Sequence, residues 1–372
     1  MDEARPVRLG RFFFVALSTL ALLLLIAVSI RVISTHSPDQ PQFIDSYEIS
    51  VVSPNTQNVQ DGPRLKAMDI EVAKANPEPS PAIIPDSSWP DQRALATSAC
   101  RLTVKVWVAN EDLLTTTREQ ILGFKESNMG SLPICFQSPE LAIALNQLCD
   151  SNSKKPIQCD IRALADIHQA SFTLENPTLP FSHLLVVVEQ GKANTRGGLM
   201  MLDANDELKV LQHELAHWLG YVDEYRVSPS QQKKLCQDGP IKWLGPNVLS
   251  APASMPLRQV EAIVERPLYP SQTCDGSERQ AYKTASSAGF MEYLDYKISD
   301  EEVAAMTQHL TNFRPIPLAM NFAQAFAVSD QEILSPEEKA LYERRYEFWL
   351  KQAAKYDSPD AHIRLALWNL KS

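Results

Sequence analysis

Apolar and polar residues follow regular spacings along the chain, and each spacing predicts an element. Alternation from Leu102 to Val108 predicts a strand with one buried face. The continuous apolar run from Leu184 to Val188 is typical of a central strand covered on both faces. Further patterns predict helices over residues 113–125, 138–148 and 161–170, and a strand from Gly197 to Leu202. This mixture of elements predicts an α/β (α+β) fold.

One further helix is predicted from Asp206 to Leu219. Its apolar stripe is formed by leucines at helical spacing, namely Leu208, Leu211, Leu215 and Leu219. His213, Glu214 and His217 lie off this stripe. Asp203 or Asn205 is expected to cap the start, and Gly220 is expected to end the helix, since glycine adopts left-handed backbone angles without strain.

The spacing of His213 and His217 predicts a zinc site. Residues four apart share one face of a helix, so the two imidazoles can bind one ion, and Glu214 is placed to hold a water beside it. A sharp turn at Gly220 would bring Asp223 back as third ligand, with the adjacent Glu224 as the alternative. Three protein ligands leave one coordination position open, as in catalytic zinc sites. The metal would acidify its water, and Glu214 would act as general base.

The run His213-Glu214-x-x-His217-x-x-Gly220-x-x-Asp223 resembles the extended zinc signature of the metzincin metallopeptidases, in the variant with Asp as third ligand. Its continuation Asp223-Glu224-Tyr225 resembles the IgA-peptidase-like family of bacterial metallopeptidases. The resemblance implies a methionine-bearing turn beneath the metal, for which Met291 in Ser287–Tyr293 is the candidate and Met255 the competitor. It also implies that Tyr293 stabilises the oxyanion of the reaction.

The same resemblance implies a mixed twisted sheet with an active-site helix. In metzincins, the strand in the position of residues 197–202 is the sheet edge against which an extended substrate lies. Gly197 and Gly198 would let the substrate backbone approach closely. The alternative is an ordinary hairpin at this place.

The N-terminal part predicts a membrane anchor. Residues 12–30 carry no charge and are long enough to cross a hydrocarbon core of about 30 Å. Arg5, Arg8 and Arg11 precede this segment, so the positive-inside bias keeps the N-terminus in the cytoplasm and exports the remainder. A cleaved signal sequence is the alternative. We expect a single-pass protein of the inner membrane with its catalytic domain in the periplasm.

All six cysteines follow this segment, and an even number on the exported side indicates disulfides. Proximity along the chain suggests two pairs, Cys149 with Cys159 and Cys236 with Cys274. A zinc-thiolate site is the alternative, although the chain contains no Cys-x-x-Cys pair. The chain also lacks an Asn-x-Ser/Thr acceptor with a permissive middle residue, which favours a bacterial periplasm over a glycosylated ectodomain.

Composition divides the chain into four regions: the anchor over 1–34, an unstructured linker over 35–98, the catalytic domain over 99–325 and a helical hairpin over 326–372. Within the catalytic domain, residues 226–282 are rich in proline and are expected to form a loop-rich insertion stapled by a disulfide. Ser299 is expected to cap a helix that runs to about Leu310. The short helical tail could dock on the domain or on a partner. The net charge of −10 disfavours nucleic acid as a partner.

Together these patterns predict a membrane-anchored periplasmic zinc metalloendopeptidase that cleaves proteins or peptides. His213, His217 and Asp223 would bind Zn2+, Glu214 would be the base, and Tyr293 would assist. Two alternatives stay open. One is a non-catalytic, zinc-stabilised module that organises an envelope assembly, and the other is a zinc amidase that acts on cell-wall peptides. The motif does not identify the natural substrate.

Overall fold

A computed structural model describes residues 100–150, 152, 154–170, 181–328 and 333–370. The predicted membrane segment and the predicted linker lie outside these residues. Among the helices of the described residues, none combines the length and apolarity needed to cross a bilayer.

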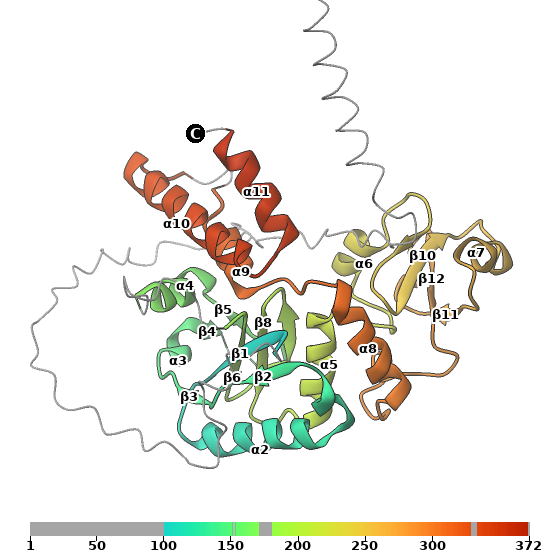
Figure 1. Ribbon diagram of the computed structural model, residues 1–372, viewed down its shortest axis with the longest axis horizontal. Helices are drawn as coiled ribbons and strands as arrows, with labels where there is room; N and C mark the ends of the chain where they lie inside the picture. Colours follow the sequence, from blue (N-terminus) through green and yellow to red (C-terminus); the bar gives the residue numbers. More distant parts are fainter. Residues whose placement is uncertain (1–99, 151, 153, 171–180, 329–332, 371–372) are drawn as a thin grey trace, which may run out of the picture. The chain divides into compact units, whose positions relative to one another are not determined.

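The main sheet has six strands within the described residues, and five of them follow the order β2-β1-β6-β8-β7 (Figure 1). Their bounds are β1 Leu102–Val108, β2 Ile134–Phe136, β6 His183–Val188, β7 Asn194–Arg196 and β8 Leu199–Asp203. The short β3, Glu140–Leu141, pairs with β1. All pairings are parallel except that of β7 with β8, which is antiparallel. The sheet is therefore mixed, in agreement with the predicted α/β (α+β) class.

The strand patterns read from the sequence agree with this sheet. In β1, every residue that the alternation assigned to the buried face is fully buried, and the strand has the predicted bounds. In β6, all six residues are buried, because this strand lies between β1 and β8 and is covered on both faces. The continuous apolar run and the central position of the strand thus have the same cause.

The helices around the sheet are α2 Asp112–Glu126, η2 Asn128–Ser131, α3 Leu145–Leu148, α4 Ile161–Ala170 and α5 Leu208–Trp218. Helices α2 and α5 contact each other and strands of the main sheet. In α4, His168 stacks on Trp107 of β1 with 4.2 Å between ring centroids. The helix expected over 138–148 is wrong in its first half, because residues Glu140–Leu141 extend along the end of β1 and only Leu145–Leu148 are helical.

The edge of the main sheet next to α5 is β7, and this corrects the expectation that residues 197–202 form the edge. Strand β8 lies between β6 and β7, and β7 with β8 forms a hairpin, which was the alternative interpretation. The backbone that approaches Gly198 is the chain's own. A Cβ atom at Gly198 would lie 2.1 Å from the amide nitrogen of Leu318, so this close contact requires glycine.

Residues 226–282 contain the strands of a second sheet, which the expectation of a loop-rich insertion did not include, whereas the expected disulfide staple is present as Cys236–Cys274. The antiparallel order β11-β12-β10-β9 is formed by β9 Lys242–Trp243, β10 Val248–Pro252, β11 Tyr269–Ser271 and β12 Arg279–Lys283 (Figure 1). Helices α6 Pro229–Leu235 and α7 Leu257–Val264 accompany it. Its prolines are tolerated because Pro270 lies in the edge strand and Pro252 at the end of β10.

The two sheets belong to different hydrophobic clusters. The main cluster includes the buried strands of the first sheet and the apolar residues of α5. A smaller cluster beside the second sheet contains Val222, Val248 and Ala281 together with one cysteine pair. Tyr221 belongs to the main cluster and Val222 to the smaller one, so the chain passes from one core to the other at this peptide bond.

Among the described residues after the second sheet there are four helices, namely α8 Asp300–Asn312, α9 Leu318–Phe326, α10 Pro336–Ala354 and α11 Pro359–Asn369. Ser299 caps α8 in a capping box with Glu302, as predicted. Helix α10 packs on α9 and α11 packs on α10. Trp349 of α10 is fully buried in the main cluster. The predicted helical hairpin therefore docks on the domain through α9.

All six cysteines are paired. The pairs are Cys100–Cys135, Cys149–Cys159 and Cys236–Cys274, and no cysteine of the described residues is free. Both pairs suggested from proximity are confirmed, and the zinc-thiolate alternative is wrong. Cys149 and Cys159 lie opposite each other in a small two-stranded sheet of β4 Cys149–Asp150 and β5 Gln158–Cys159.

Candidate metal centre

The ends of α5 determine where its side chains point. The N-cap is Glu207, without a side-chain cap, so the expectation of Asp203 or Asn205 is wrong. The Asp203 carboxylate instead accepts hydrogen bonds from the amides of Gly191 and Asn205. Gly220 ends the helix as predicted, with φ of +81°.

The reversal at Gly220 returns the chain toward the histidine face of α5. The amide of Gly220 donates to the carbonyl of His217 at 3.0 Å, and the amide of Tyr221 donates to that of Ala216 at 3.1 Å. This pair of bonds is the Schellman arrangement, which requires left-handed angles at the glycine. The chain therefore folds back after α5, and the residues that follow can reach the site.

Asp223 faces both histidines after this reversal. Its Oδ1 lies 3.1 Å from Nε2 of His213 and 3.3 Å from Nε2 of His217. A tetrahedral zinc ion with ligands at about 2.0–2.2 Å keeps them about 3.3–3.6 Å apart. Both distances from Asp223 Oδ1 are therefore close to the spacing that one ion requires. Asp223 Oδ1 is also a buried oxygen that accepts no hydrogen bond of ordinary geometry within the described residues.

The other nitrogens of the two rings are already engaged with main-chain carbonyls. Nδ1 of His213 lies 3.1 Å from the carbonyl oxygen of Phe290, and Nδ1 of His217 lies 2.8 Å from that of Tyr221. A carbonyl can only accept, so each Nδ1 carries a hydrogen, and each Nε2 is the nitrogen that can bind a metal when the ring is neutral. This is the usual second contact of metal-binding histidines, and it orients both rings toward the same space.

Glu214 lies beside the same space. Its carboxylate is within 4.8 Å of a ring nitrogen of each histidine, and the three side chains form a group that could hold a metal ion. Glu214 is buried, and its Oε2 has no hydrogen-bond partner among the described residues. Burial raises the pKa of Glu214, although the two neighbouring imidazoles act in the opposite direction.

Charge coupling links Asp223 to the histidines. Burial opposes protonation of His217, but the facing Asp223 carboxylate outweighs it and raises the pKa of His217 to about 9. Burial by itself would raise the pKa of Asp223, and the two imidazoles reverse this effect and lower it. The site therefore strongly favours a cation next to the Asp223 carboxylate.

Two imidazoles and one carboxylate thus share a small buried space, with a second carboxylate beside it. Comparison of the chain with protein-family models, with curated proteins and with solved structures found no match. The chemistry and spacing of the side chains are what make this group a candidate metal centre.

Glu224, the alternative third ligand, faces away from the histidines. Its Oε1 accepts a hydrogen bond from Nδ2 of Asn247 at 3.0 Å, and its Oε2 lies 3.3 Å from Nζ of Lys283. Lys283 also pairs with Glu292. Of the two adjacent carboxylates, the structure therefore brings only that of Asp223 to the histidines.

Of the two candidate methionines, Met291 lies next to the site. The carbonyl of the preceding Phe290 contacts His213, and the carbonyl of Met291 accepts from the amide of Glu224 at 2.9 Å. Met291 is buried in the main cluster. Met255 instead packs beside the second sheet with residues such as Leu257. The structure therefore brings Met291, and not Met255, next to this group of side chains.

Tyr293 and Tyr225 differ in their relation to the site. The Tyr293 side chain is half-exposed, and its ring packs against that of Tyr296. The Tyr225 ring stacks on His213 with 6.5 Å between centroids. Burial, followed by the neighbouring Asp223 carboxylate, raises the pKa of Tyr225. Tyr225 is a site residue for which we predicted no role, although it ends the Asp-Glu-Tyr signature.

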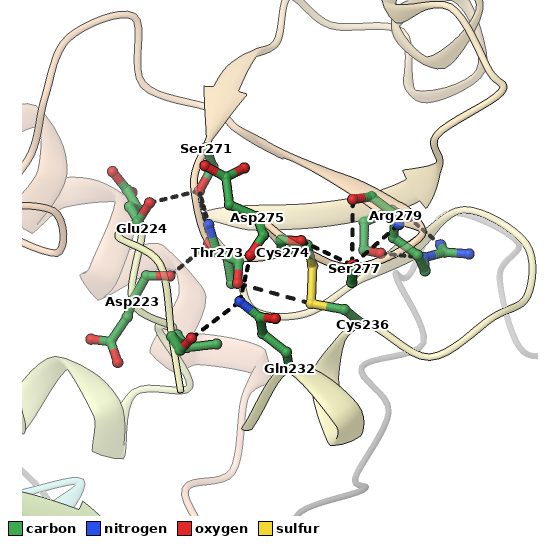
Figure 2. Close-up of a disulfide and its surroundings, with 12 residues drawn as sticks. Asp223, Glu224, Gln232, Cys236, Ser271, Thr273, Cys274, Asp275, Ser277 and Arg279 are labelled. Carbon is green, nitrogen blue, oxygen red and sulfur yellow. Dashed lines mark hydrogen bonds between the residues drawn. A yellow bond between two sulfur atoms is a disulfide. The ribbon is translucent and has the colours of Figure 1, made fainter. Parts of the chain in front are cut away.

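Other residues at the site had no sequence signal at all. Asn247 and Thr273 lie in loops beside the second sheet, and both contact the main chain of residues 222–223. Figure 2 shows the contact of Thr273 with the carbonyl of Asp223. Neither residue has a fixed spacing to His213 that a motif could contain. Only the folded chain shows that they belong to the site.

Proposed function

We propose that this chain is a zinc-dependent metallopeptidase that cleaves proteins or peptides. The observation that supports this proposal is the approach of Asp223 Oδ1 to both Nε2 atoms, at 3.1 and 3.3 Å. Glu214 supplies a buried carboxylate beside these atoms. Two imidazoles and one carboxylate bind zinc in known hydrolases, and three protein ligands leave one position for water or substrate.

The residues have separate roles in this proposal. His213, His217 and Asp223 would hold Zn2+, which supplies polarisation of the peptide carbonyl and acidification of a water. Glu214 accepts the proton of the attacking water and later donates it to the leaving amine. Met291 supports the site from beneath as part of the segment that contacts His213. Tyr225 and Tyr293 are the two candidates for stabilising the oxyanion.

The substrate would lie along β7. This strand is the edge of the main sheet. Oγ1 of Thr195 in β7 donates to the carbonyl of Glu214 at 3.0 Å, so this edge is connected to α5. An extended peptide could add to this edge through main-chain hydrogen bonds. This arrangement would present a peptide bond next to Glu214.

The proposed location is the periplasmic face of an inner membrane, with the anchor over residues 12–30. The disulfides support this part of the proposal, because such bonds persist in oxidising compartments such as the periplasm. The C-terminal helices could additionally contact a partner through their outer surface.

Two alternative functions predict different behaviour. A non-catalytic, zinc-stabilised module would bind zinc without cleaving any peptide, and the presence of Glu214 beside the histidines speaks against it. A zinc amidase would cleave short cell-wall peptides and leave proteins intact. Both alternatives share the metal centre with the proposal, so substrate assays distinguish them.

The test is cleavage of a diverse peptide library by the purified chain, with and without a chelator, followed by mass spectrometry. We expect internal cleavage that the chelator abolishes and that added Zn2+ restores. Zinc binding without any cleavage would favour the non-catalytic module. Cleavage of cell-wall peptides alone would favour the amidase, and cleavage that resists the chelator would exclude the metal mechanism.

A further inference from the structure

The main chain of residues 222–224 is held by hydrogen bonds on both sides. Asn247 Oδ1 accepts from the amide of Val222 at 3.0 Å, and its Nδ2 donates to the Val222 carbonyl at 2.8 Å. On the other side, Oγ1 of Thr273 donates to the Asp223 carbonyl at 2.7 Å, and Oγ of Ser271 donates to the Glu224 carbonyl at 3.0 Å. The main chain on either side of the Asp223 side chain is thus fixed.

Thr273 makes the bond closest to the metal-facing carboxylate. It is fully buried, and its amide donates to Oγ of Ser271 at 3.4 Å, so the two residues are linked while each hydroxyl donates its one hydrogen to a carbonyl of residues 223–224. In Figure 2 the Asp223 carboxylate points away from the loop that carries Thr273, while the Asp223 carbonyl faces it. The Asp223 carboxylate therefore faces the two histidines, and the Asp223 carbonyl accepts the hydrogen bond from Thr273.

The loop that carries Thr273 is itself anchored. Cys274, the next residue, forms the disulfide with Cys236 at the end of α6. Nε2 of Gln232 in α6 donates to the carbonyl of Asp275 at 2.7 Å and to that of Val227 at 3.1 Å. The disulfide and Gln232 thus attach the loop to α6 at two neighbouring points (Figure 2).

We propose that Thr273, held by the Cys236–Cys274 disulfide and paired with Ser271, is a positioning residue that aims the Asp223 carboxylate at His213 and His217. This inference rests on the proposed metal site. In this proposal the second sheet and its loops hold Asp223, the third ligand, at the distance from the histidines that one ion requires. Loss of partners that orient a ligand typically lowers metal affinity about 10–100-fold.

The test measures Zn2+ affinity of the purified full-length chain by competition with a chromophoric chelator. Thr273→Val keeps the shape of the side chain and removes the hydroxyl. We expect its Zn2+ affinity to fall about tenfold or more. The visible spectrum of the Co2+-loaded variant should also change, because the ligand geometry changes. Thr273→Ser should restore both properties, a rescue that a packing role alone would not give.

The matched control is Ser277→Ala. Ser277 lies in the same loop, and its hydroxyl donates to the carbonyl of Cys274 at 2.9 Å without touching Asp223. We expect wild-type Zn2+ affinity and an unchanged Co2+ spectrum for this control. If Thr273→Val does not fold, Ser271→Ala replaces it and should lower the affinity in the same direction.

Two outcomes separate this inference from the proposed function. A folded Thr273→Val variant with wild-type Zn2+ affinity and the wild-type Co2+ spectrum would overturn the positioning role while leaving the metal site intact. A wild-type chain that binds no Zn2+ would overturn the metal site, and the positioning role with it.

Discussion

Asp223 and Glu224 are neighbours in the chain, yet their carboxylates face different partners. Asp223 lies 3.1 Å from Nε2 of His213, whereas Glu224 lies 3.3 Å from Nζ of Lys283. The main chain that carries them is held by Asn247, Thr273 and Ser271, with the Asp223 carboxylate on the histidine side and the Glu224 carboxylate on the side of Lys283. One carboxylate therefore faces the histidines, and the other forms an internal ion pair with Lys283.

The first prediction compares these two residues. Asp223→Asn should leave the purified protein with far less than about one zinc per chain, because one of the three ligands loses its charge. Glu224→Gln should keep its zinc, since the amide can still accept from Asn247 and Lys283 retains Glu292. Elemental analysis measures both. If only Glu224→Gln loses its zinc, the third ligand is Glu224 and not Asp223.

Glu214→Gln should abolish peptide cleavage while the zinc content stays that of wild type. The amide occupies the same volume but cannot accept the proton of the attacking water, and general bases typically contribute about 10²–10⁴-fold to the rate. Peptide turnover and zinc content are measured on the same preparation. Turnover equal to that of wild type would exclude Glu214 as the base, and loss of zinc would assign it to the ligands.

Phenylalanine variants distinguish the roles of Tyr225 and Tyr293 in the proposed reaction. Tyr225 stacks on His213 and interacts with Asp223, whereas Tyr293 packs on Tyr296, and both side chains are partly exposed. We expect Tyr225→Phe to lower kcat by about tenfold or more with little change in KM, as expected when one hydrogen bond to the transition state is lost. Tyr293→Phe should have the smaller effect. The reverse order would favour the role of Tyr293 that the metzincin resemblance implies.

A pH effect on stability is expected from His168. Burial, assisted by Lys105, lowers its pKa to about 3, whereas the unfolded chain has the ordinary value of about 6.5. Between pH of about 6.5 and about 3, His168 is therefore protonated in the unfolded state and neutral in the folded state. The free energy of unfolding should fall by about 1.4 kcal/mol per pH unit from this residue as the pH drops toward 3.

His168→Phe tests this effect, because it keeps a ring stacked on Trp107 and removes the titration. Urea unfolding between pH of about 6 and 4 should show a shallower pH dependence for this variant than for wild type. His362→Phe is the control, since His362 is exposed and should give the wild-type slope. Parallel curves for wild type and His168→Phe would contradict the prediction.

Trp349 tests whether the C-terminal hairpin is part of the domain. It is fully buried and packs edge-on against Phe322 of α9, with 4.6 Å between ring centroids. Trp349→Ala should lower the free energy of unfolding by about 3–5 kcal/mol, as for other large core residues. Leu367→Ala, which is 55% exposed, should be close to neutral. An unchanged melting temperature of Trp349→Ala would show that the hairpin folds separately.

Patterns within single elements predicted much of the fold. Strand β1, helix α4 and the buried strand β6 have nearly the bounds read from the sequence, because each buries a face whose period is visible locally. The reversal at Gly220 was also predictable, since its left-handed angle depends on the absence of a side chain. The two predicted disulfides, Cys149–Cys159 and Cys236–Cys274, each join cysteines that are consecutive in the sequence.

Contacts between distant segments were not predictable. The second sheet was missed because its strands are short and interrupted by prolines, which weakens the alternating pattern. The position of β7 at the edge depends on pairing across the whole sheet. Asn247 and Thr273 act on main-chain atoms of residues 222–224, and such bonds leave no periodic signal in a sequence.

The passage of the chain from one core to the other between Tyr221 and Val222 has a consequence for how the protein would unfold. The two histidines are carried by the larger core, and Asp223 follows a residue of the smaller one. An ion bound by all three residues would therefore connect the two hydrophobic cores. We expect the zinc-loaded protein to melt in a single step, and removal of the ion to let the smaller sheet melt first.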